Sequence, residues 1–157
     1  MADFAEDVVI QLESLTRRLT RLESQRPAWI NWTPTITQSV SVTATINQAR
    51  YTIIGNTVHV YAEVTATSAG TAGNAITIGG FPSVITPFTF YVADISPLGT
   101  ASVLDQGVGT YAGMLVALSD TAWHLWSPAT NNNIGANPSF ALANTDIIVW
   151  NATYELA

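Results

Sequence analysis

The sequence predicts an all-β domain, an antiparallel β-sandwich of the jelly-roll-like kind, preceded by a short α-helical parallel trimeric coiled coil. Three observations support this fold class. Charged residues are concentrated in the first 26 positions, apolar residues recur there with a heptad rhythm, and from Trp29 onward apolar and polar residues alternate with a period of two. We therefore expect a trimerisation and attachment helix over residues 1–26 and a β-sandwich domain over residues 27–157.

Composition excludes several classes of protein. The chain has 157 residues, of which 48% are apolar and only 10% charged, so a folded core is expected rather than disorder. Cysteine is absent, which removes disulfides, thiolate catalysis and cysteine zinc sites. A net charge of -6 argues against a nucleic-acid partner. No apolar run reaches the roughly 20 residues of a membrane span, and the acidic N-terminus is unlike a signal peptide, so we expect a soluble, unprocessed chain with no membrane insertion.

The N-terminal helix has a defined start and end in the sequence. Asp3 and Glu6 have the spacing of a capping box, and Pro27 ends the helix because it lacks a backbone donor and pushes the preceding residue out of the helical region. Between them, apolar residues recur at alternating spacings of four and three. They are Val8, Leu12, Leu15, Leu19 and Leu22.

This apolar stripe predicts self-association. With Leu12 and Leu19 at heptad positions a, the other three apolar residues fall at d. Arg18 then lies at g and Glu23 at the following e, where a parallel neighbour can close an ion pair between helices. The alternative is an amphipathic helix packed on its own domain, but such helices normally have a broader apolar face.

Residues 18–23 also resemble the short Arg-hydrophobic-x-x-hydrophobic-Glu motif that is associated with three-stranded parallel coiled coils. Three heptads are too few to be stable alone, so the β-domain must supply most of a trimer interface. Phe4 at a g position and Ile10 at an outward position have no use within a short coiled coil. We expect these two residues to contact another protein.

The clearest element of the β-domain is a hairpin over residues 50–64. Gly55 and Asn56 make its turn, and the second strand alternates strictly between apolar and polar residues. Turn signals at intervals of 8–12 residues mark the other strands and favour a sandwich or jelly roll over an α/β fold. These strands are expected at 32–37, 40–46, 74–79, 86–95, 99–106, 110–118, 121–127 and 145–155.

No residues with an evident catalytic, cofactor-binding or metal-binding pattern emerge. His59 and His124 lie far apart on different expected strands, outside any cluster with metal-ligand spacing, and we expect structural or cross-strand roles for them. The aspartates of the β-domain fall near strand ends, where Asp commonly serves turns. They are Asp94, Asp105, Asp120 and Asp146. The protein is therefore not expected to be an enzyme.

An aromatic and amide-rich stretch is the candidate binding site. Alternation places Trp123 on one face of a strand and Trp126 on the other, so that at least one of them belongs to the core. Aromatic faces beside amides suit sugar rings. Possible glycan contacts are Trp126, Asn131, Asn132 and Asn133. The alternative is that both tryptophans fill the core or a subunit interface. Trp29 and Trp32 are expected to lock the helix onto the β-domain.

Several segments carry a family resemblance. They are the heptad segment, Trp32-Thr33-Pro34-Thr35, Ala49 to Val58, Gly80-Phe81-Pro82 and the closing strand Trp150 to Leu156. Together they resemble the β-domains at the ends of tailed-bacteriophage appendage proteins, such as minor tail proteins, short fibres and head-attached fibres. The resemblance implies a homotrimer on the exterior of a virion, in contact with other virion proteins.

Three functions are compatible with this resemblance and with the composition. The first is a tail fibre or spike-type appendage whose β-domain meets glycan on the host surface. The second is a capsid decoration protein or head fibre. The third is a non-viral adhesin or carbohydrate-binding module. The sequence does not separate the first two.

Overall fold

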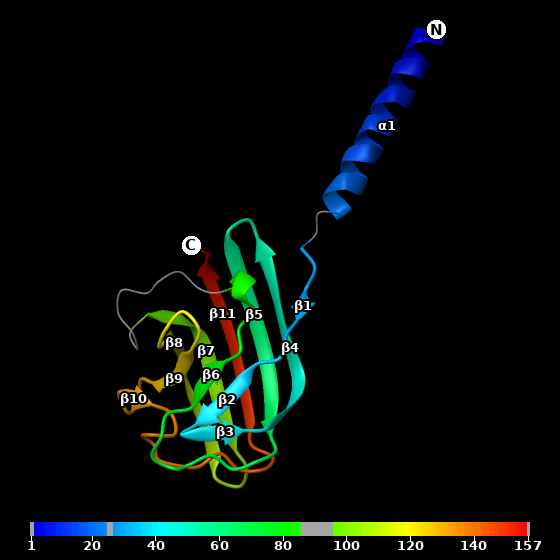
Figure 1. The fold of residues 1–157 in the computed structure, drawn as a ribbon. Helices are drawn as coiled ribbons and strands as arrows, with labels where there is room; N and C mark the ends of the chain where they lie inside the picture. The colour runs from blue at the N-terminus through cyan, green and yellow to red at the C-terminus, as the bar shows by residue number, and fades with distance from the viewer. Residues whose placement is uncertain (1, 25–26, 86–95, 157) are drawn as a thin grey trace.

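The computed structural model describes residues 2–24, 27–85 and 96–156, and within the helix it describes the side chains of residues 8–20. It comprises one N-terminal helix, α1 (Ala2–Ser24), and a β-domain (Figure 1). The helix confirms the expected N-terminal element, which ends before Pro27. The side chains of Asp3 and Glu6 and the expected strand at 86–95 lie outside the described part.

Strands occupy most of the positions where the alternation of apolar and polar residues predicted them. A 3-10 turn, η1, spans Ser83–Ile85. The strands are β1 (Ile30–Asn31), β2 (Thr35–Gln38), β3 (Val40–Val42), β4 (Ala44–Ile54), β5 (Thr57–Ala66), β6 (Thr77–Gly79), β7 (Pro97–Asp105), β8 (Gly109–Ala117), β9 (Trp123–Ser127), β10 (Asn132–Asn133) and β11 (Ile147–Glu155).

The described strands form one continuous antiparallel sheet. Its order is β1-β4-β5-β11-β7-β8-β9-β6-β2-β3, and β10 pairs with β9. The last strand of the chain, β11, lies between β5 and β7 and pairs with both along most of its length. The last described strand is therefore an inner strand of the sheet, with a hydrogen-bonded neighbour on each side (Figure 1).

The sheet curls into a half-barrel around its core. Trp123 on β9 lies 5.5 Å from Tyr154 on β11, measured between ring centroids, although β7 and β8 stand between these strands in the sheet order. The expectation of an antiparallel all-β domain is confirmed. A division into two sheets is not shown, because β6 pairs with both β9 and β2 and links the two halves. A trimeric coiled coil is likewise not shown.

The predicted hairpin is confirmed. Ile54 pairs with Thr57 across the turn, and Gly55 adopts a φ of 62°, which glycine reaches without steric cost. Along β5, buried and half-buried residues alternate, with Val58, Val60, Ala62, Val64 and Ala66 facing inward. The period of two therefore determines which face of this strand meets the core.

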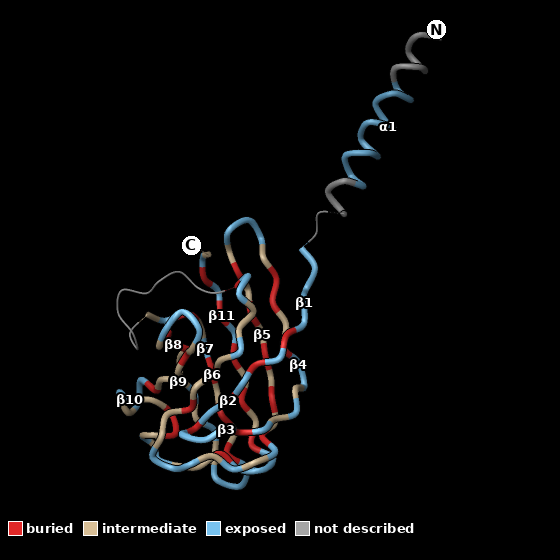
Figure 2. Tube along the Cα trace, in the orientation of Figure 1, coloured by how far each residue is buried: buried red, intermediate tan, exposed pale blue. Residues whose placement is uncertain are grey.

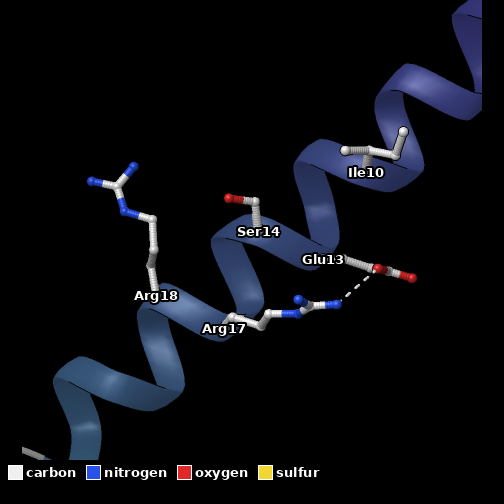
Figure 3. A pocket seen from close by; sticks show the side chains of 5 residues that line it. All are labelled: Ile10, Glu13, Ser14, Arg17 and Arg18. Atoms are coloured by element: carbon white, nitrogen blue, oxygen red, sulfur yellow. Dashed lines mark hydrogen bonds and ion pairs between the residues drawn. The ribbon is translucent and has the colours of Figure 1, made fainter.

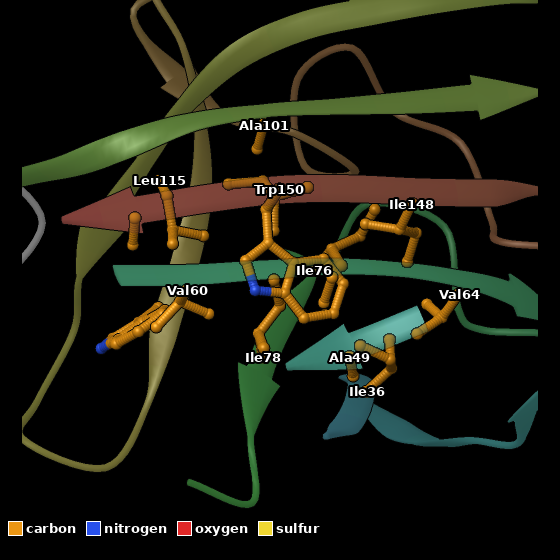
Figure 4. Packing of buried hydrophobic residues seen from close by; sticks show 14 of the residues in the cluster. Ile36, Ala49, Val60, Val64, Ile76, Ile78, Ala101, Leu115, Ile148 and Trp150 are labelled. Atoms are coloured by element: carbon orange, nitrogen blue, oxygen red, sulfur yellow. The ribbon is translucent and has the colours of Figure 1, made fainter. Parts of the chain in front are cut away.

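The core is filled by aliphatic and aromatic side chains from both halves of the curled sheet. Figure 2 shows buried positions alternating along the strands, and Figure 4 shows Trp150 of β11 among aliphatic residues of other strands. Trp150 and Trp123 are fully buried. At roughly 1.5–3 kcal/mol for each large apolar side chain, this burial is a main source of stability for the β-domain.

Candidate functional site

The first candidate site is the apolar stripe of α1. Val8 is 41% exposed, Leu12 and Leu15 are each 58% exposed, and Leu19 is 60% exposed. The other described side chains of the helix, from Val9 to Thr20, are exposed as well, Arg18 among them. The stripe therefore lies uncovered in the single chain. Leu22 and Glu23, the remaining predicted contacts, lie outside the described side chains.

Polar contacts along α1 are local to the helix. Arg17 and Glu13 form an ion pair at 3.4 Å with both side chains exposed, so it contributes little to stability. The Thr16 hydroxyl donates to the carbonyl of Leu12, one turn earlier. These local contacts leave the apolar stripe uncovered.

A second face of α1 carries outward apolar residues. Ile10 is 59% exposed and Val9 54% exposed. Ile10 borders a shallow depression of about 330 Å³ whose walls are side chains of the helix itself, as Figure 3 shows: Ile10, Glu13, Ser14, Arg17 and Arg18. The depression is open and belongs to one helix face, so it is not an enclosed cavity. Phe4, the other predicted attachment residue, lies outside the described side chains.

The two tryptophans that follow the helix have different environments. Trp32 is 8% exposed and packs in the core, 6.4 Å from Trp150 and 6.0 Å from Phe81 between ring centroids. Trp29 remains 46% exposed, and its ring lies 4.8 Å from the guanidinium carbon of Arg50. Trp32 therefore anchors the segment after the helix to the β-domain, whereas Trp29 stays at the surface.

The expected division of the β9 tryptophans is confirmed. Trp123 is fully buried, with its ring centroid 3.9 Å from that of Phe81. Trp126 is half-buried on the opposite face of the strand, and it pairs across strands with Met114 of β8. An aromatic side chain is thus available at the outer surface of the sheet.

The Asn131–Asn133 segment lies beside Trp126. Asn133 is the direct cross-strand partner of Trp126, and its Nδ2 atom lies 3.2 Å from Nδ1 of His124. Asn131 and Asn132 are exposed, and Asn131 has a φ of 51°, a conformation that asparagine tolerates in turns. The structure thus places Asn133 next to Trp126, whereas Asn132 pairs with Ser127, which faces the other side of β9, and no contact joins Asn131 to Trp126.

The histidines occupy separate places, in line with their expected cross-strand roles. Nδ1 of His59 on β5 lies 3.1 Å from the hydroxyl oxygen of Thr153 on β11. His124 on β9 contacts Asn133. In the described ranges, no group of three or more His, Asp or Glu residues could hold a metal ion. The same part of the chain holds no helix that is long and apolar enough to cross a membrane.

One pair of aspartates is close enough to interact. Asp146 is 1% exposed and accepts hydrogen bonds from the backbone amides of Gln106 at 2.9 Å and Ala143 at 2.8 Å. Burial, and secondarily the charge of Asp146, raises the pKa of Asp105. Asp146 thus holds two loops together, which is the turn role expected for it. Asp120 is exposed in a turn, and Asp94 lies outside the described residues.

Sequence reasoning missed a buried polar side chain. Gln38 on β2 is fully buried; its Nε2 atom donates to the carbonyls of Asn74 and Phe140, and its Oε1 atom accepts from the amide of Leu142. A signal was present, because the alternation along β2 places Gln38 on the same inward face as Ile36. This glutamine fastens two loops to the sheet and has a structural role.

Comparison with known proteins yields no relative. No family model matches the chain, and neither a curated protein nor a solved structure matches it.

Proposed function

We propose that this chain is a structural protein of a bacteriophage virion, a homotrimeric appendage of the tail-fibre or spike type. In this proposal α1 joins three parallel copies and contacts other virion proteins, and the β-domain faces outward toward the host surface. The observation that carries the proposal is an uncovered heptad stripe on a helix that leads directly into a charge-poor all-β domain.

Exposing the apolar stripe of α1 to water is unfavourable in free energy. Burying a leucine side chain fully contributes roughly 1.5–3 kcal/mol, and three of the stripe residues are leucines that are more than half exposed. In proteins most helical stability comes from packing an amphipathic face, and the described side chains of the 23-residue helix α1 have no such packing. Three parallel copies would bury the stripe and stabilise each helix. The alternative, a helix packed on its own domain, receives no support from the described side chains.

Composition supports a close assembly of β-domains. Beyond Pro27 the chain has one basic and six acidic residues, so its surface relies on Ser, Thr and Asn rather than on charges. Exposed sheet edges of low charge tend to pair with other chains unless they are covered. A specific trimer would cover them with hydrogen-bonding groups that cost little to bury.

The oligomeric state is the first test. Light scattering of the purified chain at micromolar concentration should give three times the chain mass. A monomer mass at that concentration would refute the assembly and, with it, the appendage.

Attachment is the second test. Deleting residues 1–11, which include Phe4 and Ile10, should leave a folded trimer that is absent from virus particles. Imaging of intact particles would then locate the wild-type protein on the tail or on the capsid. Normal occupancy of the deletion variant would show that the anchor lies elsewhere.

A further inference from the structure

An unpaired arginine stands out on the outer face of the β-domain. Arg50 on β4 is the only basic residue after Pro27, and it forms no ion pair with any described residue. Its Nε atom is buried without a hydrogen-bond partner. Leaving a buried donor unsatisfied is unfavourable, and more so for a charged group. The buried Nε atom is out of a ligand's reach, whereas the terminal guanidinium nitrogens keep a donor capacity that the described part of the chain does not use.

Two uncommitted amide side chains lie beside this arginine. Asn31 on β1 is the direct cross-strand partner of Arg50, and Gln48 lies two residues before Arg50 on the same face of β4. Both residues are exposed. Neither side chain hydrogen-bonds to a described residue. Amides in this state can bind hydroxyl groups as donors and as acceptors.

Trp29 holds the arginine in place. The guanidinium carbon lies 4.8 Å from the centroid of the Trp29 ring, which is the geometry of a cation–π contact. Trp29 is nevertheless 46% exposed, so part of its apolar surface stays available. An arginine fixed in this way loses less conformational entropy when it binds a ligand.

The surface beside these residues is hollowed. Asn31 and Gln48 border a depression of about 350 Å³, whose other walls are Trp32, Ile46, Asn47 and Ala49. The edge of β4 is open at this place because β1 pairs with it only at Tyr51 and Arg50, and a β-bulge interrupts the register between Ile46 and Gln48. Trp29 and Arg50 do not line this open depression, which adjoins them through Asn31 and Gln48.

We propose that Trp29, Asn31, Gln48 and Arg50 form a binding site for an acidic saccharide, one that carries a carboxylate or a phosphate group. The guanidinium recognises the acidic group through paired hydrogen bonds. The amides bind sugar hydroxyls, and the exposed part of the tryptophan ring packs on the apolar face of a sugar. The site differs from the Trp126 surface, and the proposal rests on these four residues rather than on the trimer or the virion.

Charge around the site makes the expected binding selective. Residues 27–157 have a formal net charge of -5, from one arginine against six acids. Such a surface does not attract anions in general, so binding depends on Arg50 itself. Because one cation carries the interaction, affinity should fall moderately with added salt.

The test titrates the full-length protein with three probes: trigalacturonic acid, galactotriose bearing one phosphate monoester, and neutral galactotriose. Calorimetry measures affinity, and NMR follows the indole N–H of Trp29, assigned with Trp29→Phe. We expect an acidic probe to bind at least about tenfold more tightly than the neutral sugar, because charge-assisted hydrogen bonds are stronger than neutral ones. The Trp29 signal should move with that probe only. Binding of a single acidic probe supports the proposal and identifies the acidic group.

Two variants distinguish specific binding at Arg50 from nonspecific attraction of the acidic probe by positive charge. Arg50→Gln should lose about tenfold in affinity, whereas Arg17→Gln, which removes the same charge from the helix, should lose nothing. Circular dichroism and light scattering check that Arg50→Gln keeps its fold and mass, so that loss of the site is distinguished from loss of assembly. If that variant does not fold, the NMR titration of the wild-type protein remains as the test: an acidic probe should shift the indole N–H signal of Trp29, and no shift would overturn the proposal. Equal binding of the neutral sugar, no binding of either acidic probe, or unchanged affinity in folded Arg50→Gln would overturn the proposal.

Discussion

Replacing Gln38 by Leu should destabilise the β-domain strongly, although the change adds apolar character to a buried position. Gln38 Nε2 donates to the carbonyl oxygens of Asn74 at 3.1 Å and Phe140 at 2.8 Å, and Oε1 accepts from the amide of Leu142 at 2.8 Å. Leucine has a similar size but no polar atoms. The substitution therefore leaves three backbone groups without their partners.

The magnitude follows from these three groups. Each unsatisfied buried group costs about 1–3 kcal/mol, and the loops that carry them can shift to let water reach some of them. We therefore expect a loss of about 3–5 kcal/mol in the free energy of unfolding. That loss is a large part of the roughly 5–15 kcal/mol that stabilises an ordinary domain.

Gln38→Glu provides a pH-dependent comparison. A carboxylate at this position keeps the acceptor but sets a negative oxygen against two carbonyls, and burial favours its neutral form. Its pKa should thus be higher in the folded than in the unfolded state, where it is about 4.3. The stability that the neutral acid contributes is present below the unfolded-state pKa and is lost as the pH rises through the folded-state pKa. The free energy of unfolding of this variant should therefore be smaller at pH 7 than at pH 4.

Urea unfolding followed by tryptophan fluorescence, at one fixed protein concentration, measures these effects. Gln106→Leu is the matched control, because Gln106 is exposed and its change should stay within about 0.5 kcal/mol. If Gln38→Leu unfolds within about 1 kcal/mol of the wild type, the three hydrogen bonds do not hold the loops as described.

Three further predictions concern the helix, an acidic pair and the outer surface. Leu15→Asp combined with Leu19→Asp should reduce the mass in solution to that of one chain, because charges facing each other between the helices cannot be buried unpaired. Far-UV circular dichroism should keep the β signal, and a persistent trimer would contradict this prediction. Asp105→Asn should raise the melting temperature at pH 7 and lose that advantage near pH 3.5. Burial, and secondarily the charge of Asp146, raises the pKa of Asp105, so ionisation of Asp105 disfavours the folded state. An equal gain at both pH values would refute a raised pKa of Asp105. Under the proposed function, Trp126→Ala should reduce adsorption of the protein to host cells without a change in fold, and undiminished adsorption would remove this residue from the proposed glycan contacts.

The sequence alone determined those features that depend on local periodicity. The heptad spacing from Val8 to Leu22 predicted the helix, and the alternation from Val58 to Val64 predicted both a strand and its buried face. A single residue pair, Gly55 and Asn56, predicted the turn of the hairpin. Each of these depends on neighbours within a few positions, which a linear pattern contains in full.

Tertiary structure decided which distant segments meet. The position of β11 between β5 and β7, the curl that brings Trp123 to Tyr154, and the continuity of the sheet through β6 all depend on pairings between residues far apart in the chain. Alternation specifies a face for each strand but not its neighbour, so a sandwich and a curled sheet have the same local pattern. For this reason the all-β class was predictable and the strand order was not.

The candidate sites divide in the same way. The pattern Trp123 to Trp126 predicted one buried and one outward tryptophan, whereas the pairing of β10 with β9 decided that Asn133 lies beside Trp126. Arg50 was visible in the sequence as a lone basic residue. Only the antiparallel pairing of β1 with β4 placed Asn31 opposite it, because register between strands arises from backbone hydrogen bonds rather than from the order of residues along either strand.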